Sequence, residues 1–308
     1  IELGVKIPTF SMEETDLKPR YGSRKTNSTL EEALEAEKAN MVDICVPTFL
    51  HEEFAVKAAN AKCHVLCEKP VTFTLDSFDR MVNACKENNV EFMVAQVARW
   101  WPEFTVIKDY FNQDRIGKVH MIYEKRLAQH PNWATWHRDP EKSGGGLYDL
   151  NIHDIDFLYS ILGMPKRVYA VGWKSPSGCW NHVSTSMTWE DGTKAICETS
   201  LEMIGNYPFS IEFRGTGDKG TIEYTFTAGF NIKDEVGGAK FLFYPAGEEN
   251  AQKLEADQKD MFVAEIGAFV SAVIDGKPLP IAPQESRDVL KITLAIKRSL
   301  EEGVAVDL

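Results

Sequence analysis

The sequence lacks the features that mark several large classes of protein. No apolar run approaches the roughly 20 residues of a membrane-spanning helix, and no signal-peptide pattern precedes Ile1, so we expect neither a membrane nor a secreted protein. Positive charge is also scarce, since 34 Lys and Arg stand against 46 Asp and Glu and the net charge is −12. An acidic surface repels phosphate backbones, which argues against a nucleic-acid partner.

The six cysteines contain no CxxC pair and lie in apolar segments, which is typical of reduced core thiols in a cytoplasmic protein. Cys63 and Cys67 would share one face of a strand, but the strand period turns His64 to the other face, so we predict no metal. No P-loop, HExxH helix or Ser/His/Asp nucleophile elbow is found.

A chain of 308 residues, 44% apolar and 26% charged, is long enough for two domains with substantial cores. Its first part alternates short apolar runs with longer amphipathic ones, after a capping-box pattern that starts at Ser28. The predicted order is helix 30–39, strand 41–46, helix 50–59, strand 63–67, helix 75–87 and strand 91–95. We also expect a possible strand at 1–7. This alternation predicts a Rossmann-type parallel-sheet domain over residues 1–118.

The alternation of short apolar and longer amphipathic segments ends after Gly117. A strand is predicted at 119–126, and residues 166–244 read as mostly extended, with turns at 176–178, 191–192 and 215–220. Two amphipathic helices close the chain. We therefore predict an α/β chain whose second domain, 119–308, is α+β with a large, mostly antiparallel open sheet. The literal GxGxxG match at 215–220 precedes an alternating strand, so we interpret it as a hairpin turn.

The carboxyl ends of the predicted parallel strands carry candidate cofactor contacts, because open α/β sheets bind ligands at that edge. Pro70 biases Lys69 toward an extended backbone that would aim its ammonium into the crevice, although a salt-bridging surface lysine is an alternative. His51 could instead be a cap or core-edge residue. The candidate cofactor-binding residues are Pro47, Thr48, His51, Glu68, Lys69, Pro70 and Gln96.

A glycine-rich stretch, Gly144, Gly145 and Gly146, could allow close approach to a ligand. It is followed by an amphipathic helix to about residue 162, on which Asp149 and His153 would project from one face. This pair could hold a substrate and move its proton. A surface or capping pair is the alternative, and the neighbouring Asp154 and Asp156 could be the solvated face of the helix.

Aromatic and cationic residues near these segments suit a hydroxylated substrate with a carboxylate or phosphate, and suit a domain interface nearly as well. The candidate substrate-binding residues are Lys69, Arg99, Trp136, His137, Arg138, Asp149, Asn151 and His153. The loops at 133–139 and 230–236 would decide which substrate is accepted.

The chain resembles the Gfo/Idh/MocA family of NAD(P)-dependent oxidoreductases, which includes inositol dehydrogenase and glucose–fructose oxidoreductase. Three stretches carry the resemblance, in the order VPTFLHEEFAVKAANAKCHVLCEKP, RWWPEF and GGGLYDLNIHDID, and it extends over residues 21–308. It implies a nucleotide-binding domain, then a domain on a large open sheet that commonly mediates dimers or tetramers.

The resemblance also implies roles. The family lysine of EKP, which contacts substrate and nicotinamide, matches Lys69, and the family aspartate and histidine match Asp149 and His153. The family histidine is the general base on a sugar or polyol hydroxyl, while hydride leaves for NAD or NADP. An imidazole titrates near neutral pH and an ammonium stabilises a developing alkoxide, so the residue chemistry agrees.

The family's first strand and GxGxxG loop are not identifiable here, nor is the acid that would bind the ribose, so NAD versus NADP stays open. Omitted residues, a disordered cofactor half or a degenerate member would each explain this, and we expect a gap or distorted sheet near the N-terminus. A dehydrogenase is the leading prediction. An enzyme that uses transient oxidation to eliminate or hydrolyse, and a non-catalytic dinucleotide or sugar sensor, are the alternatives.

Overall fold

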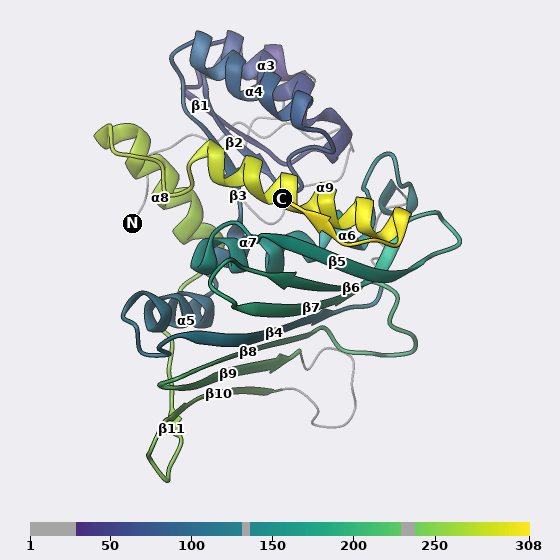
Figure 1. The fold of residues 1–308 in the computed structure, drawn as a ribbon. Helices are drawn as coiled ribbons and strands as arrows, with labels where there is room; N and C mark the ends of the chain where they lie inside the picture. The colour runs from purple at the N-terminus through teal and green to yellow at the C-terminus, as the bar shows by residue number, and fades with distance from the viewer. Residues whose placement is uncertain (1–28, 131–135, 229–237) are drawn as a thin grey trace. The chain divides into compact units, whose positions relative to one another are not determined.

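The computed structural model describes residues 29–130, 136–228 and 238–308. The chain divides into two compact units (Figure 1). The first contains the chain up to Ala95 together with Phe269–Pro283, and the second contains Gln96–Ala268 together with Gln284–Leu308. The predicted strand at 1–7 and the predicted distortion near the N-terminus lie outside the described residues.

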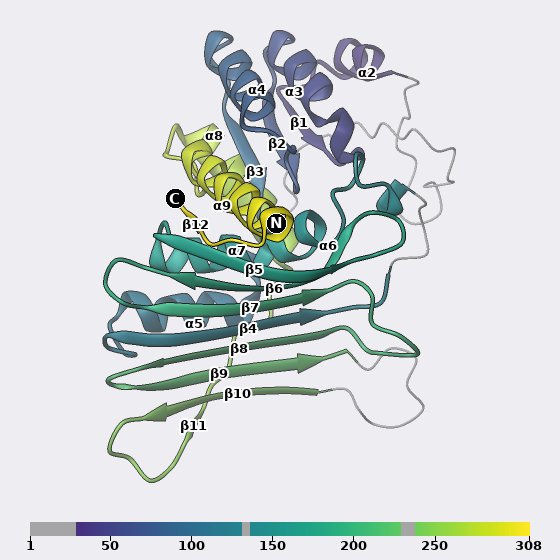
Figure 2. The same cartoon turned by 45° about the vertical axis from the view of Figure 1, so that its right-hand side comes forward.

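The first unit contains a parallel sheet in the order β1-β2-β3, as predicted for a Rossmann-type domain. Helices α3 and α4 lie side by side against it (Figures 1 and 2). Its elements are α2 (Leu30–Glu37), β1 (Met41–Ile44), η1 (Thr48–Leu50), α3 (His51–Asn60), β2 (His64–Glu68), α4 (Leu75–Glu87) and β3 (Phe92–Ala95).

Threonine caps begin two of these helices. Thr29 Oγ1 accepts a hydrogen bond from the Glu32 backbone N–H at 3.1 Å, so Thr29 caps α2 rather than the predicted Ser28. Thr74 caps α4 in the same way. The apolar side of α4 is buried, with Phe78 and Met81 at most 1% exposed. Local capping and an amphipathic pattern are therefore enough to place α4 on the sheet.

The second unit is built on one open sheet of nine strands, in the order β11-β10-β9-β8-β4-β7-β6-β5-β12 (Figure 2). Only the β4–β7 pairing within this sheet is parallel, as the prediction of a mostly antiparallel sheet requires. The strands are β4 (Val119–Leu127), β5 (Arg167–Lys174), β6 (Trp180–Thr188), β7 (Lys194–Ser200), β8 (Ser210–Gly217), β9 (Gly220–Thr227), β10 (Gly238–Pro245), β11 (Gln252–Lys253) and β12 (Val306–Asp307).

The remaining elements are helical, and several of them cover one face of this sheet. They are η2 (Val97–Trp100), α5 (Pro102–Asn112), η3 (Trp136–Arg138), α6 (Gly146–Asp149), α7 (Asn151–Leu162), α8 (Met261–Asp275) and α9 (Pro283–Glu302). The core between helices and sheet is aromatic. Phe104 of α5 stacks on Phe157 of α7 at 4.4 Å between ring centroids, and both rings contact Phe213 of β8.

The predicted hairpin turn at residues 215–220 and the predicted domain boundary near residue 118 can both be compared with the structure. The GxGxxG match is the β8–β9 hairpin, in which Gly217 pairs with Gly220, as predicted. The change of unit falls after Ala95 rather than near residue 118, and Phe269–Pro283 belongs to the first unit. The reason is that α5, which the alternation pattern assigned to the first domain, buries Phe104 against the second unit's helix and sheet.

Candidate functional site

The carboxyl edge of the parallel sheet carries the EKP segment. Glu68 ends β2, and its carboxylate accepts a hydrogen bond from the Lys69 backbone N–H at 3.0 Å. The Lys69 side chain is half-buried, and the peptide bond between Lys69 and Pro70 is cis. The carboxylate thus holds the backbone of the lysine at the point where the chain leaves the strand.

His51 ties two loops of this edge together. Its Nε2 lies 2.8 Å from the Val46 carbonyl oxygen and its Nδ1 lies 3.1 Å from that of Val71. The side chain is 1% exposed, and burial lowers the pKa of the imidazole. His51 therefore joins the turn after β1 to the segment after EKP, which favours the core-edge interpretation over a direct cofactor contact.

The other predicted cofactor residues lie at the ends of β1 and β3. Pro47 is half-buried and Thr48 is 4% exposed, where η1 begins. Gln96 directly follows β3 and is 1% exposed, and its Oε1 has no hydrogen-bond partner among the described residues. A buried, unpaired acceptor at the carboxyl edge fits a ligand with amide or hydroxyl donors, as a dinucleotide has.

In the second unit, the glycine stretch turns sharply into α6. Gly144 and Gly145 have φ angles of 70° and 73°, a region that favours glycine. The helix predicted through residues 149–162 is interrupted, because Leu150 has φ −113° and separates α6 from α7. Asp149 ends α6 and His153 lies in the first turn of α7, so the prediction that both lie on one regular helix is wrong.

Asp149 and His153 still differ from their neighbours. Both are half-buried, as is the apolar Leu150 between them, whereas Tyr148, Asn151, Ile152 and residues 154–158 are buried. Part of each residue is therefore accessible to solvent, although the Nδ1 atom of His153 is itself buried. A group that takes a proton from a bound substrate must be reachable by that substrate, and partial exposure meets this condition.

The two further acids of this segment are not a solvated face, so that alternative is wrong. Asp154 is 1% exposed and pairs with Arg126, with Nε to Oδ1 at 2.8 Å. Asp156 is fully buried and pairs with Arg99. Each carboxylate has a buried guanidinium partner, as a buried charge requires.

Two of the predicted substrate-binding residues, Arg99 and Asn151, instead form hydrogen bonds within this core. Arg99 is 8% exposed, and its nitrogens donate to Asp156 and Glu285. Asn151 is fully buried and donates from Nδ2 to Thr199 Oγ1 at 2.7 Å and to Cys197 Sγ at 3.0 Å. Their hydrogen bonds within the second unit argue against direct substrate contact for either side chain.

The turn Trp136–Arg138 precedes the glycines. The rings of Trp136 and His137 stack at 3.9 Å between centroids, with His137 buried and Arg138 exposed. Ser143 Oγ donates to the His137 carbonyl oxygen at 2.8 Å, which holds this turn near the glycine stretch. Residues 133–135 of the predicted specificity loop, and all of 230–236, lie outside the described residues.

Two supporting residues had not been singled out in the sequence. Ser143 Oγ accepts a hydrogen bond from the Gly145 N–H at 3.0 Å, and Asn181 Oδ1 accepts one from the Gly146 N–H at 2.8 Å. Asn181 occupies an inward position of β6 that Val183 and Met187 otherwise fill with apolar side chains. A polar residue in the apolar phase of a strand was the available signal.

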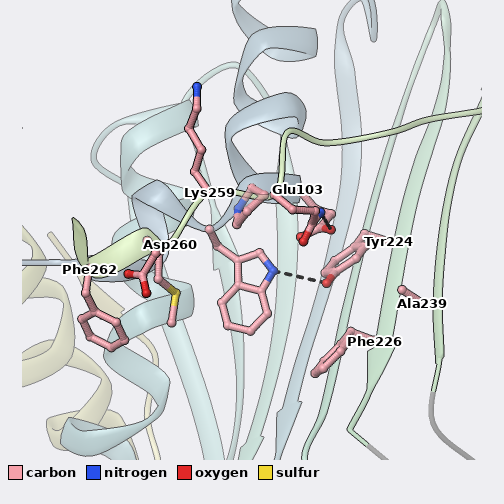
Figure 3. A pocket seen from close by; sticks show the side chains of 11 residues that line it. Glu103, Tyr224, Phe226, Ala239, Lys259, Asp260 and Phe262 are labelled. Carbon is pink, nitrogen blue, oxygen red and sulfur yellow. Dashed lines mark hydrogen bonds between the residues drawn. The ribbon is translucent and has the colours of Figure 1, made fainter. Parts of the chain in front are cut away.

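A separate cavity of about 520 Å³ lies in the second unit (Figure 3). Trp101, Tyr224, Phe226 and Phe262 supply its aromatic lining, and Trp101 Nε1 donates to the Tyr224 hydroxyl at 3.2 Å. None of the predicted site residues lines it. Within the described ranges, no helix is long and apolar enough to cross a membrane, and no three His, Cys, Asp or Glu side chains gather as a metal site would require.

Comparison with known proteins agrees with this architecture. Residues 11–96 match the model of an oxidoreductase family with an NAD-binding Rossmann fold, and residues 104–223 match the GFO/IDH/MocA C-terminal domain. The chain belongs to the Gfo/Idh/MocA family. It is therefore an NAD(P)-dependent oxidoreductase by family, with the N-terminal Rossmann domain as its cofactor-binding part.

Relatives span most of the chain. Myo-inositol 2-dehydrogenase of Thermotoga maritima is 26% identical over 95% of this chain and 87% of its own length. D-xylose 1-dehydrogenase (NADP(+)) 2 of Haloferax volcanii is 27% identical over 96% of this chain and 87% of its own. The solved complex of levoglucosan dehydrogenase with NADH and levoglucosan shares the fold, with a TM-score of 0.80, 23% identity and coverage of 98% and 90%.

Proposed function

We propose that this Gfo/Idh/MocA protein transfers a hydride between NAD(P) and a CH–OH group of a sugar, a cyclic polyol or a related compound. The observation that carries the proposal is the partial exposure of Asp149 and His153 in a segment whose two other acids, Asp154 and Asp156, are buried and paired with arginines. Relatives named for myo-inositol and D-xylose support the substrate class.

In this proposal His153 is the general acid/base. It removes the hydroxyl proton during oxidation and returns it during reduction, and a positioned imidazole contributes about 10²–10⁴-fold to such a step. Asp149 orients the substrate hydroxyl or the imidazole. Neither role needs Asp154 or Asp156, because both carboxylates are already paired with arginines.

Lys69 stabilises the oxygen on which negative charge develops. Lys69 is half-buried and follows a parallel strand at the ligand-binding edge of the Rossmann sheet, and a cation stabilises a developing negative charge more strongly at a partly buried site than in bulk water. Bound NAD(P) supplies the hydride acceptor at this edge. Gln96 Oε1 and the backbone around Pro47 and Thr48 are the groups that we assign to holding it.

The experiment is a turnover assay. The purified chain is incubated with NAD⁺ or NADP⁺ and, separately, with myo-inositol, D-xylose and D-glucose, and the absorbance of reduced nicotinamide is followed. Net reduction supports the dehydrogenase. Altered sugar without net reduction would indicate transient oxidation, and NADH binding without any turnover would indicate a sensor; either outcome would replace the proposal.

We also propose that the open face of the nine-stranded sheet forms a homodimer or homotetramer. Tyr169, Val171 and Trp173 alternate along β5 on that face and are 42%, 54% and 50% exposed, an unusual set of large apolar groups to leave in water. Light scattering after size-exclusion chromatography tests this, with Trp173→Asp expected to weaken the assembly. A monomeric wild-type chain at micromolar concentration would refute it.

A further inference from the structure

A buried amide holds the start of α6. Asn181 is 1% exposed, and its Oδ1 accepts the hydrogen bond from the Gly146 N–H, the first residue of α6, at 2.8 Å. A backbone N–H can only donate, so the oxygen of this amide must face Gly146 and its nitrogen must face away. The point at which the chain turns toward Asp149 is thereby tied to β6.

The other end of the amide is held as well. Asn181 Nδ2 donates to Glu202 Oε1 at 2.7 Å and to Ser175 Oγ at 3.3 Å. A carboxylate is the stronger acceptor of the two. Reversing the amide would place its oxygen against that carboxylate and its NH₂ against the Gly146 N–H, so Glu202 allows one orientation only.

The glycines permit this close contact. A Cβ on Gly145 would lie 2.5 Å from Cys179 Cβ and 2.7 Å from Asn181 Oδ1, and a Cβ on Gly146 would lie 3.0 Å from the Asn181 carbonyl oxygen. The glycine stretch is therefore packed on the start of β6, and two buried side chains, Ser143 and Asn181, fix its backbone.

We propose that Asn181 is a positioning residue for the reaction, because it sets where α6 begins and hence where Asp149 and His153 point, and that Glu202 sets the orientation of its amide. The inference rests on the proposed function of those two residues. A displacement of about 1 Å at a reacting group can cost about 100-fold in rate. The loss should appear in turnover and not in cofactor binding, which belongs to the Rossmann domain.

The test exchanges the donor and the acceptor of the hydrogen bond between Asn181 and Glu202. Asn181→Asp keeps an acceptor for the Gly146 N–H but sets a second carboxylate against Glu202. In the double variant Asn181→Asp/Glu202→Gln, the new amide can donate to the new carboxylate, so both contacts are possible again. Glu190→Gln is the matched control, because it removes a carboxylate whose side chain is 78% exposed.

Three readouts are compared in the full chain. Hydrogen exchange by mass spectrometry follows the peptide 144–150 and needs no substrate. Turnover is measured with myo-inositol and D-xylose, and NADH affinity by nicotinamide fluorescence. For Asn181→Asp we expect about 10-fold faster exchange in that peptide and a 10- to 100-fold lower kcat, with NADH affinity changed less than about twofold. The double variant should return kcat to within about fivefold of wild type.

Exchange and kcat unchanged in Asn181→Asp, or no rescue in the double variant, would overturn the inference. If Asn181→Asp does not fold, Glu202→Leu at its half-buried position replaces it, and unchanged exchange in that variant has the same consequence. Failure of the proposed function is recognised separately: His153→Ala would then keep wild-type turnover, whatever Asn181→Asp does.

Discussion

Arg99 and Asp156 form a two-point ion pair inside the second unit, with Nε to Oδ2 and Nη2 to Oδ1 both at 2.8 Å and side chains 6% and 0% exposed. The third guanidinium nitrogen donates to Glu285 at 2.6 Å. One side chain therefore joins η2, α7 and α9. Because Asp156 lies three residues after His153, the pair also holds the helix that carries the proposed base.

Replacing this arginine should be costly. Arg99→Ala leaves the Asp156 carboxylate buried without a cation, and breaking a buried pair in this way costs about 3–5 kcal/mol of unfolding free energy. Urea denaturation followed by tryptophan fluorescence measures the loss. Arg298→Ala is the control, since its pair with Glu302 is exposed to solvent, and we expect no measurable change there. Equal losses in both variants would contradict the structural role of Arg99.

The buried side chain of Glu124 should make the free energy of unfolding depend on pH, and the direction of the change can be predicted. It is 1% exposed, and neither carboxylate oxygen has a hydrogen-bond partner in the part of the chain that the structure describes. Burial, with a smaller contribution from the Asp154 charge, raises the pKa of Glu124 well above its usual range, against the opposing charge of Arg126. The folded protein therefore keeps a proton on this side chain at pH values where the unfolded chain has released it.

A raised pKa stabilises the folded state below the unfolded-state pKa and loses that contribution as pH rises toward the folded-state value. Across this window the wild type should lose about 1.4 kcal/mol per pH unit relative to Glu124→Gln, which cannot ionise. Unfolding free energies of both proteins at a series of pH values from 4 to 8, roughly the usual range of maximal stability, measure the difference. Parallel curves would show that Glu124 is ionised in the fold.

Gly145 and Gly163 allow a matched comparison, because their φ angles are 73° and 70°. An alanine Cβ at Gly145 would lie 2.5 Å from Cys179 Cβ, whereas at Gly163 nothing lies within 4 Å. Gly163→Ala should cost about 1–3 kcal/mol from the backbone alone, because φ 70° with ψ −160° is a conformation essentially restricted to glycine. Gly145→Ala should cost at least about 2 kcal/mol more, from overpacking. Thermal unfolding measures both, and equal losses would mean that the glycine stretch can move away from β6.

The local parts of this structure could be predicted from the sequence, and the long-range parts could not. Helix α4 was predicted at 75–87 and is found at Leu75–Glu87, because its threonine cap and apolar period lie within the segment itself. The partners of Arg99 lie 57 and 186 positions away, so no local pattern indicates that its guanidinium is paired.

The same limit applies to the candidate site. Asp154 and Asp156 follow a histidine in a polar run that is typical of a solvated face. In the structure both are buried and form ion pairs with arginines from β4 and η2. The support of Gly146 by Asn181 depends on β6, because Asn181 lies 35 positions away from Gly146 in the chain. The identity of the candidate residues could be read from the motif, but not their hydrogen-bond partners.

His153→Ala tests the proposed base directly. For hydroxyl oxidation we expect kcat to fall by about 10²–10⁴-fold, the usual contribution of general acid–base catalysis. His120→Ala is the control, because the His120 side chain is 52% exposed, pairs with Asp218 and lies on β4. It should turn over at the wild-type rate. Undiminished turnover in His153→Ala would remove this residue from the mechanism.

Lys69→Met completes the test of a shared mechanism. If the ammonium and the imidazole act on one oxygen, each single substitution removes most of the benefit of the other, since residues that act as a unit are strongly non-additive. We therefore expect Lys69→Met/His153→Ala to be slower than the slower single variant by no more than about 10-fold. Steady-state kcat for the wild type, both single variants and the double variant gives the coupling. Losses that multiply in full would mean that Lys69 and His153 serve separate steps, and the assignment of Lys69 to the reacting oxygen would have to be abandoned.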